Sequence, residues 1–163
     1  MEKTVFYSRM KSPIGDLTLT SDGEALTGLY MREQKYRPQQ AREWQRDDDA
    51  LAQVRAQLQA YFGGELREFN LRLAAEGSQF QKRVWQALCD IPYGETISYG
   101  ELARRIGRPG GARAVGLANG RNPIAIVVPC HRVIGAGGSL TGYGGGLERK
   151  RWLLAHESTG SLI

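Results

Sequence analysis

The hydrophobic pattern of the chain changes near residue 77, and this change limits the folds that the chain can adopt. Three short β-prone runs separated by turn sequences come first, at residues 4–7, 17–20 and 26–30. Beyond residue 77, apolar residues recur at the spacing of amphipathic helices. Strands followed by helices are typical of an α+β fold. We therefore expect a mixed α/β protein with an antiparallel sheet in an N-terminal lobe, residues 1–77, and a mostly helical C-terminal lobe, residues 78–163.

The N-terminal lobe should also contain one helix. Four apolar residues recur at helical spacing before a Gly-Gly pair ends the run: Leu51, Val54, Leu58 and Tyr61. The three aspartates at 47–49 precede this run and predict an N-cap and a negatively charged first turn. Residues 69–73 alternate between apolar and polar, which predicts one further strand.

The C-terminal lobe begins with a helix and continues with a helix-turn-helix pattern. Ser78 can cap a helix that ends near Pro92. A capping box, with Ser98 as N-cap and a glutamate three residues later, opens a short helix. The Gly- and Pro-rich turn at 107–111 separates it from a second short helix, residues 112–119. Two short helices joined in this way are typical of a helix-turn-helix unit.

The second short helix consists almost entirely of small residues, and Arg113 is its one large cation. Such a helix can approach another backbone closely, either a packed helix or a nucleic-acid groove. Taken alone, the pattern favours internal packing, with Arg113 paired to a carboxylate.

Positive charge is concentrated in the C-terminal lobe. Residues 1–77 hold 11 Lys and Arg against 12 Asp and Glu, whereas residues 78–163 hold 11 against 5. Nine of those 11 cations are arginines, whose guanidinium groups match phosphate in bidentate geometry, so a phosphate-bearing polymer is favoured as partner. A merely solubilising basic surface is the alternative that charge leaves open.

Membrane insertion and disulfide bonding are disfavoured. The longest apolar run, residues 124–128, is far shorter than the roughly 18 residues of a membrane span. The N-terminus carries charges where a signal peptide needs its apolar region. Cys89 and Cys130 are the only cysteines and have unrelated flanks, which argues against a disulfide framework. We expect a cytoplasmic protein with at least one free thiol.

Cys130 is the candidate nucleophile. It follows an apolar run, residues 124–128, that predicts a buried strand, and it lies between Pro129 and the pair His131 and Arg132. Nearby positive charge lowers the pKa of a thiol and increases its nucleophilic thiolate fraction. Adjacent side chains in an extended chain point apart, so His131 should reach the thiol through a water molecule or a bend. Cys89, by contrast, lies four residues after Trp85 on one helical face and should be inert packing.

The segment around Cys130 resembles a known active site. Residues 124–135, with Pro129-Cys130-His131-Arg132 at their centre, resemble the Pro-Cys-His-Arg motif of the 6-O-alkylguanine-DNA alkyltransferases. The similarity extends from Phe80 to Glu157 in the family's order and spacing, through Arg-Ala-Val-Gly at 113–116, Asn122-Pro123, residues 143–147 and residues 154–157. Residues 1–77 resemble the family's N-terminal lobe more loosely, chiefly through Ser12-Pro13-Ile14-Gly15. The resemblance implies a ribonuclease-H-like sheet in that lobe.

The resemblance also implies a function, namely repair of alkylated DNA. Such a protein moves an alkyl group, for example methyl, from oxygen 6 of guanine, and also from oxygen 4 of thymine, to its own cysteine. The damaged nucleotide first flips out of the duplex, because its target atom lies inside the base stack. A thioether does not regenerate, so each molecule acts once. The expected partner is double-stranded DNA, bound in the minor groove and largely independent of sequence. We expect a monomer without a cofactor, with cooperative binding along DNA left open.

Five residues take catalytic roles when the resemblance is carried over by position. Cys130 is the acceptor, and His131 and Glu157 form, through water, the relay that takes its proton. Tyr99 matches the family's donor to the guanine. Asn122 matches the asparagine that ties the DNA-reading helix to the active-site strand.

The resemblance further implies a DNA-contacting set and a substrate pocket. Arg113 matches the arginine that fills the gap left by the extruded nucleotide. The whole DNA-contacting set consists of Phe80, Tyr99, Gly100, Arg108, Arg113 and Ala136. Val133 and Tyr143 match positions in the pocket.

Departures from the family pattern exclude some features and leave two other functions open. Some members hold zinc in the N-terminal lobe, but this chain has no cysteine before Cys89 and its histidines are His131 and His156, so no metal site is expected. His156 should pack against or cap the last helix, expected at residues 147–157 after a glycine-rich loop. The alternatives are a non-catalytic module that binds alkylated DNA and a cysteine hydrolase built on Cys130 and His131.

Overall fold

The sheet of the N-terminal lobe has the expected antiparallel meander. In the computed structural model, which describes residues 4–140 and 142–160, three strands pair antiparallel in sequence order: β1 (Phe6–Met10), β2 (Leu17–Ser21) and β3 (Leu26–Met31). The sequence pattern does not predict the two-residue strand β4 (Gln45–Arg46), which pairs parallel with β1 and completes the order β3-β2-β1-β4.

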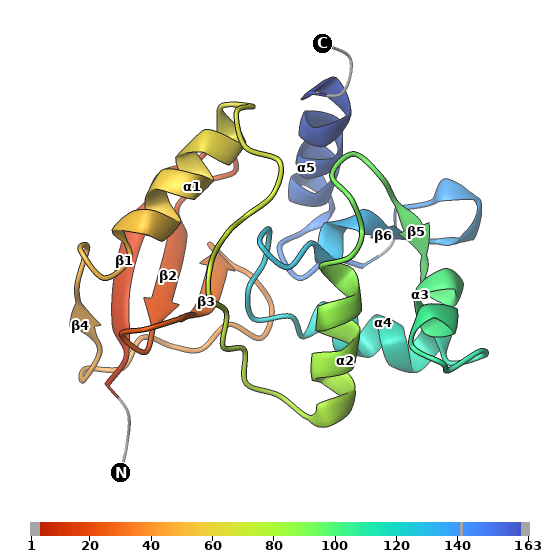
Figure 1. Cartoon of the computed structure of the whole chain (residues 1–163), viewed down its shortest axis with the longest axis horizontal. Helices are drawn as coiled ribbons and strands as arrows, with labels where there is room; N and C mark the ends of the chain where they lie inside the picture. The colour runs from red at the N-terminus through yellow and green to blue at the C-terminus, as the bar shows by residue number, and fades with distance from the viewer. Residues whose placement is uncertain (1–3, 141, 161–163) are drawn as a thin grey trace.

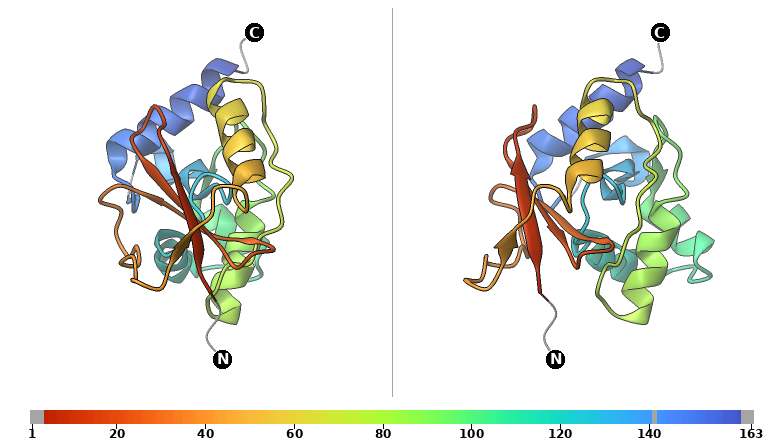
Figure 2. Two further views of the ribbon diagram at one scale, coloured as in Figure 1. Left: turned by 90° about the vertical axis from the view of Figure 1, so that its left-hand side faces the viewer. Right: turned by 60° about the vertical axis from the view of Figure 1, so that its left-hand side comes forward.

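The predicted helix of the N-terminal lobe, α1 (Ala52–Phe62), is present and lies against one face of the sheet (Figures 1 and 2). The prediction that an aspartate caps it is wrong, because the N-cap is Leu51, which makes no side-chain cap hydrogen bond. The aspartates come too early in the chain and act elsewhere. Asp47 accepts a backbone hydrogen bond in the preceding turn, and Asp48 accepts the hydroxyl of Ser8 on β1 at 2.7 Å.

Residues 69–73 do not form the predicted strand. They make one isolated parallel bridge, in which Leu73 pairs with Leu26 of β3. The apolar members of the segment, Phe69, Leu71 and Leu73, are partly buried against the core. Their alternation therefore reflects the burial of one side of an irregular segment.

Four helices build the C-terminal lobe: α2 (Gln79–Leu88), α3 (Tyr99–Arg105), α4 (Ala112–Gly120) and α5 (Leu147–Gly160). Ser78 caps α2 and Ser98 caps α3, each side chain accepting a backbone N–H at 3.1 Å. Around α2 the capping box is complete, whereas the carboxylate of Glu101 in α3 pairs with Arg104 at 2.9 Å. The predicted cap of α3 is thus right and its predicted return bond is replaced by an ion pair.

The helix-turn-helix unit is α3 and α4. The turn between them places Gly107 and Gly110 at positive φ, 76° and 84°, where L side chains are disfavoured. The indole Nε1 of Trp85 on α2 donates to the carbonyl of Ala118 on α4 at 2.8 Å. This buried bond fixes α4 against α2, so the small-residue helix packs inside the lobe with one side and leaves the other side free.

The apolar run at 124–128 is buried as predicted but is not a strand. Ile126 adopts a left-handed φ of 71°, and the backbone closes on itself through a Val128 N–H to Ile124 carbonyl bond of 3.0 Å. A single bridge joins Ile124 to Leu29 of β3. The run forms a compact turn because both lobes bury it and side-chain bonds, described below, hold it curled.

Both lobes share one continuous apolar core. α5 returns to the N-terminal lobe and lies beside α1 (Figure 2), where the His156 Nε2 and the Tyr61 carbonyl are 2.7 Å apart. Among the described residues, no helix combines the length and the apolar character that crossing a bilayer needs.

We predict that Trp85→Phe weakens the fold by loosening α4. The change removes the indole donor from the carbonyl of Ala118, which keeps only the N–H of Arg121 at 3.1 Å, and it creates a small cavity, so the free energy of unfolding should fall by about 2–4 kcal/mol. Urea unfolding measures this loss. Trp152→Phe, at a half-buried indole on α5, is the matched control and should cost less than about half as much. Equal losses for the two variants would contradict the role of the Trp85 bond.

Candidate active site

Cys130 lies in a short 3-10 turn, Cys130–Arg132, directly after Pro129, and is 6% exposed. The prediction that it ends a strand is therefore wrong. The strand β6 (Val133–Ile134) follows at once and pairs parallel with β5 (Ile97–Ser98). This pairing brings Tyr99, the first residue of α3, close to the segment that carries the thiol.

Two asparagines tie α4 to the Cys130 segment. The Nδ2 of Asn122 donates to the carbonyl of Val128 at 2.8 Å, and its Oδ1 accepts the N–H of Ile124 at 3.0 Å. The Nδ2 of Asn119, on the last turn of α4, donates to the carbonyl of Cys130 itself at 3.4 Å. Both asparagines are buried, so a displacement of α4 would carry over to the backbone of the nucleophile.

The carboxylate of Glu157 on α5 lies at the centre of a buried network. Its Oε2 accepts from the hydroxyl of Tyr61 on α1 at 2.7 Å and lies 2.8 Å from the Nε2 of His131. Arg132 donates to both carboxylate oxygens, at 2.8 and 3.0 Å. Burial alone would raise the pKa of Glu157, but the hydrogen bonds from His131 and Arg132, together with the charge of Arg132, outweigh it and hold that pKa well below its usual range. The carboxylate is therefore an anion with only acceptor capacity.

This anion fixes the tautomer of His131. Since Glu157 can only accept, the Nε2 of His131 must carry the hydrogen, which leaves Nδ1 with a free lone pair. Burial lowers the pKa of His131, so the ring is neutral near pH 7. Within the described part of the chain, the buried Nδ1 has no hydrogen-bond partner. The ring thus offers one unused base nitrogen at the residue next to Cys130.

The residues beside Cys130 in sequence do not supply the positive charge predicted from them. Arg132 is committed to Glu157 and to the carbonyl of Ile91, which it reaches at 2.6 Å, and His131 is neutral. Burial raises the pKa of the Cys130 thiol. The prediction of a pKa lowered by these two neighbours is therefore wrong, because the fold directs both of them to the buried carboxylate.

Groups from elsewhere in the chain favour the thiolate. The Asn122 amide, the Lys150 ammonium and the Tyr143 hydroxyl all act to lower the pKa of Cys130, although burial outweighs them. Lys150 on α5 is itself fully buried, and its Nζ donates to the carbonyl of Val133 at 2.7 Å. Sequence reasoning did not assign Lys150 or Tyr61 to the site, since neither belongs to a motif, although Tyr61 was expected on the buried face of its helix.

An open groove of about 750 Å³ lies in front of this site. Its walls come from the start of α2, the start of α3, α4 and the glycine-rich loop, and they include the predicted site residues Phe80, Tyr99 and Tyr143. Tyr143 also contacts the thiol, and burial raises the pKa of its hydroxyl well above the usual value. Cys130 is not part of the wall, and Tyr143 is the wall residue that interacts with its thiol. Val133, the other predicted pocket residue, is fully buried.

The remaining members of the predicted DNA-contacting set lie around the groove and not in its wall. Arg108 is exposed in the turn before α4, and its guanidinium lies 5.4 Å from the centre of the Phe80 ring. Arg113 is exposed on the first turn of α4, and among the described residues it makes no ion pair, so the alternative of an internal carboxylate partner is not realised. Gly100 follows Tyr99 on α3, and Ala136 is exposed after β6.

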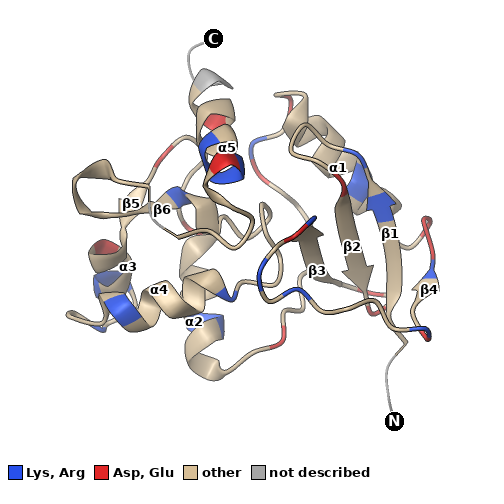
Figure 3. Ribbon diagram, turned by 180° about the vertical axis from the view of Figure 1, so that it is seen from behind, with Lys and Arg blue, Asp and Glu red and all other residues tan. Residues whose placement is uncertain are grey.

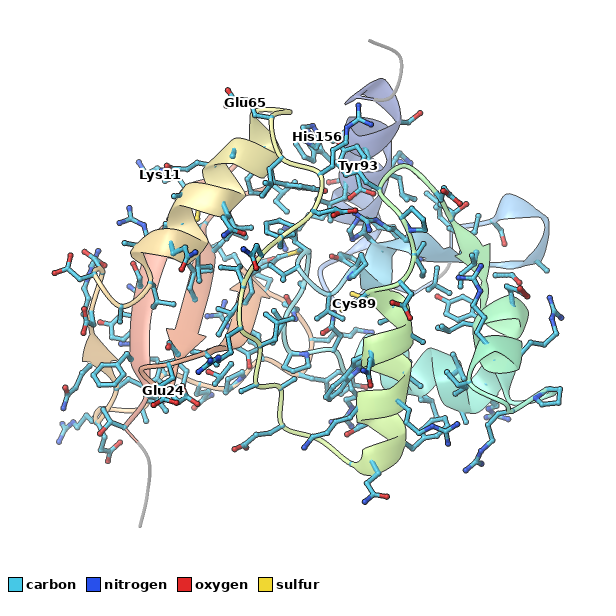
Figure 4. All side chains as sticks on the ribbon, in the orientation of Figure 1. Lys11, Glu24, Glu65, Cys89, Tyr93 and His156 are labelled. Atoms are coloured by element: carbon cyan, nitrogen blue, oxygen red, sulfur yellow. The ribbon has the colours of Figure 1, made fainter. Side chains whose placement is uncertain are left out.

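Two residues assigned to packing behave differently from each other. His156 packs as predicted, stacked on Trp152 at 4.8 Å between ring centres. Cys89 is exposed where α2 ends, so its assignment to the core is wrong: the helix turns this position outward, toward a hollow between the lobes (Figure 4). Within the described residues, no three His, Cys, Asp or Glu side chains gather closely enough to hold a metal ion.

Comparison with known proteins identifies relatives for both lobes. Residues 5–75 match the family model described as the ribonuclease-like domain of 6-O-methylguanine DNA methyltransferase. Residues 79–159 match the model of the DNA binding domain of the same family.

Individual relatives match almost the whole chain. A methylated-DNA--protein-cysteine methyltransferase of Mycobacterium tuberculosis is 59% identical over 155 residues, which cover 95% of this chain and 93% of that protein. One of Methanosarcina acetivorans is 50% identical over 155 residues, covering 95% and 99%. Among solved structures, the crystal structure of Mycobacterium tuberculosis OGT in complex with DNA superimposes with a TM-score of 0.89 at 58% identity, covering 95% of this chain and 94% of that one.

We predict that Glu157→Gln destabilises the protein in a pH-dependent way. Losing the anion leaves buried Arg132 unpaired, which should lower the free energy of unfolding at pH 7 by about 3–5 kcal/mol. Because the pKa of Glu157 is lower in the folded than in the unfolded protein, its stabilisation is complete above about pH 4.5 and is lost at more acid pH. The difference from the unmodified protein should therefore shrink as the pH falls. Urea titrations between pH 3 and pH 7 measure it.

Two further variants serve as comparisons for that experiment. Tyr61→Phe removes one donor and keeps the ion pair, so it should cost less, about 1.5–3 kcal/mol. Glu148→Gln, at an exposed carboxylate on the first turn of α5, should change little. If Glu157→Gln cost no more than Glu148→Gln, the central role of the buried carboxylate would be refuted.

Proposed function

The chain belongs to the 6-O-methylguanine DNA methyltransferase family, and from this premise we propose that it repairs DNA by moving an alkyl group from oxygen 6 of guanine to the thiol of Cys130. The surroundings of the Cys130 thiol are the observation that supports its role as the alkyl acceptor. The buried thiol interacts with Tyr143 in the wall of the groove, and the next residue in the chain, His131, has an unused base nitrogen. Cys89, the other cysteine, lies at the end of α2 and has no such surroundings.

The proposed reaction is a single displacement. The sulfur of Cys130 attacks the alkyl carbon in line with the bond to oxygen 6, a sulfur–carbon bond forms, and the carbon–oxygen bond breaks. His131, held by Glu157, takes the thiol proton through water at its Nδ1. Guanine leaves with its electron pair and regains a proton on the ring, with Tyr99 as the hydrogen-bond donor to it. The thioether is stable, so each molecule acts once.

We assign DNA binding to the helix-turn-helix unit. α4 presents a face of small residues to the minor groove, and Arg113 on its first turn occupies the space that the extruded nucleotide leaves. Phe80, Tyr99, Gly100, Arg108 and Ala136 contact the DNA around it. Two asparagines support this assignment: Asn119 on the last turn of α4 bonds to the carbonyl of Cys130, and Asn122 just beyond the helix bonds to the carbonyl of Val128.

Substrate entry requires a local movement. Cys130 is 6% exposed and is not part of the groove wall, whereas Tyr143 belongs to that wall and interacts with the thiol, so we expect an incoming guanine to displace the Tyr143 segment. Four glycines surround Tyr143, at 142 and 144–146, which makes this segment the part of the wall with the fewest side chains to move. Val133, behind the site, completes the pocket.

We further propose that the lobes divide between residues 77 and 78 and that the protein is cytoplasmic. The division is supported by the ends of the two family matches, residues 75 and 79. The location is supported by the need for access to DNA and for a thiol that stays reduced.

We predict that Cys130→Ser abolishes alkyl transfer and leaves duplex binding within a few-fold, because a neutral hydroxyl is a far weaker nucleophile. The measurement is transfer of labelled methyl from a duplex containing 6-O-methylguanine, followed by mass spectrometry of the labelled peptide. Cys89→Ser is the matched control and should transfer one methyl per protein. Label on the Cys89 peptide would refute Cys130 as the acceptor. Many turnovers per protein would indicate a hydrolase. No label on the unmodified protein would leave only a DNA-binding module.

We predict that Arg113→Ala slows transfer from duplex DNA by about 10- to 100-fold and affects transfer from free 6-O-benzylguanine much less. Only the duplex requires extrusion of the nucleotide, which costs a few kcal/mol. Single-turnover rates on the two substrates give the comparison. Arg151→Ala, which removes an exposed arginine of α5, should leave both rates unchanged. Equal losses on both substrates would contradict the proposed role of Arg113.

A further inference from the structure

The mouth of the groove carries three side chains that the family resemblance does not assign to DNA: Lys35, Tyr36 and Arg121. We propose that these three form a second DNA-binding site, the rim site, which holds backbone phosphates of the strand whose nucleotide enters the groove. This inference rests on the proposed function, since it places the damaged nucleotide in that groove. It assigns part of the DNA contact to the N-terminal lobe.

Arg121 stands at the opposite end of α4 from Arg113. Arg121 is the C-cap of the helix, and eight residues at 1.5 Å each place the two arginines about 12 Å apart along the axis. Ala114 and Leu117 lie between them on the exposed side, and Leu117 is 71% exposed. An apolar helix face with a cation at each end is suited to the minor groove of DNA, because each cation can contact one of the two phosphate backbones that border the groove.

The guanidinium of Arg121 is stacked on the ring of Tyr36. Its central carbon lies 3.8 Å from the ring centre, and Tyr36 is 63% exposed. Stacking orients the guanidinium plane and leaves its N–H edge available for a phosphate. Among the described residues, no carboxylate lies within 4.0 Å of the side-chain nitrogens of Arg121 or Lys35. Both cations are therefore open to an external anion.

The loop that carries Lys35 and Tyr36 is fixed against the groove. The N–H of Lys35 donates to the carbonyl of Gly144, next to Tyr143, at 2.9 Å. Arg37 donates to the carbonyl of Met31 at 2.9 Å, which closes the loop at its base. Glu33 and Tyr36 both adopt left-handed backbone, with φ of 62° and 61°, a conformation that L side chains keep only where their surroundings impose it.

The ligand of the rim site is a backbone phosphate, because a flipped nucleotide remains covalently joined to its strand. A nucleotide that turns into the groove stays joined to its strand, so the phosphates on either side of it must lie at the mouth. Figure 3 shows the Lys and Arg positions of the loop after β3 adjoining the end of α4, whereas the N-terminal lobe as a whole has slightly more acidic than basic residues. Lys35 of this loop and Arg121 both line the groove, where the phosphates have to be.

The test compares Arg121→Ala and Lys35→Ala with Arg151→Ala, which removes the same charge from the exposed side of α5. Dissociation constants for a duplex containing 6-O-methylguanine are measured from 0.05 to 0.5 M salt. One lost phosphate contact should lower the slope of log K against log salt by about 0.9 and weaken binding at 0.15 M by about fivefold. Arg121→Lys should keep most of the slope. Tyr36→Phe keeps the ring and should bind as the unmodified protein does. Tyr36→Leu removes the ring that orients Arg121, so its affinity and salt slope should lie between those of the unmodified protein and Arg121→Ala.

The position of the contacted phosphate is tested by changing the DNA, in which a single phosphate is replaced by a neutral methylphosphonate. Neutralising a phosphate that flanks the damaged guanine should weaken the unmodified protein and leave Arg121→Ala little changed, and neutral positions ten nucleotides away should affect both alike. The rim site is refuted if Arg121→Ala and Lys35→Ala match Arg151→Ala in affinity and slope. Methyl transfer from the duplex to the unmodified protein is measured in parallel. If no methyl is transferred, the proposed function is refuted. If transfer is normal and the two variants keep the affinity and salt slope of Arg151→Ala, only the rim site is refuted.

Discussion

One buried anion, the carboxylate of Glu157, joins the parts of the molecule on which the active site depends. It takes hydrogen bonds from α1 through Tyr61, from the Cys130 turn through Arg132, and from the ring of His131. A buried charge with this many donors is stable only while all of them are in place. The position of α5, the contact between the lobes and the tautomer of His131 therefore depend on the same two oxygen atoms.

The residues that pair with the buried carboxylate differ from those that stabilise the thiolate, although the sequence places His131 and Arg132 directly beside Cys130. His131 and Arg132 follow Cys130 directly, but the 3-10 turn directs both toward Glu157, where one is a neutral base and the other a structural counter-ion. The thiolate is favoured instead by the amide of Asn122, just beyond the end of α4, and by the charge of Lys150 on α5. In the resting site burial outweighs them, so the thiol keeps its proton until the reaction provides for its removal. A buried, protonated thiol is also protected from oxidation and from alkylation by small molecules.

Periodicity and capping predicted the meander, the helix pair and the last helix, because those elements are determined by local spacing and by which face is buried. The failures share a physical cause, which is that side-chain bonds from distant residues overrode local pattern. Asn122 curls the apolar run at 124–128 into a turn, although five consecutive apolar residues favour a strand. Asp48 bonds to Ser8 on β1 instead of capping α1. The motif residues could be identified from the sequence through their resemblance, whereas Tyr61 and Lys150 act through tertiary contacts that no local pattern encodes.

The N-terminal lobe contributes to both sides of the site, which explains why the chain needs it beside a complete helix-turn-helix unit. Behind the thiol, Tyr61 of α1 completes the shell of donors around Glu157. In front, the loop after β3 reaches Gly144 and stacks Tyr36 on Arg121. α4 is thereby held at one end by the N-terminal lobe and, through Asn119 and Asn122, bonded to the Cys130 segment itself. The end of α4 is joined to the backbone at Val128 and Cys130 by buried hydrogen bonds, so a displacement of this helix end would also displace the Cys130 backbone.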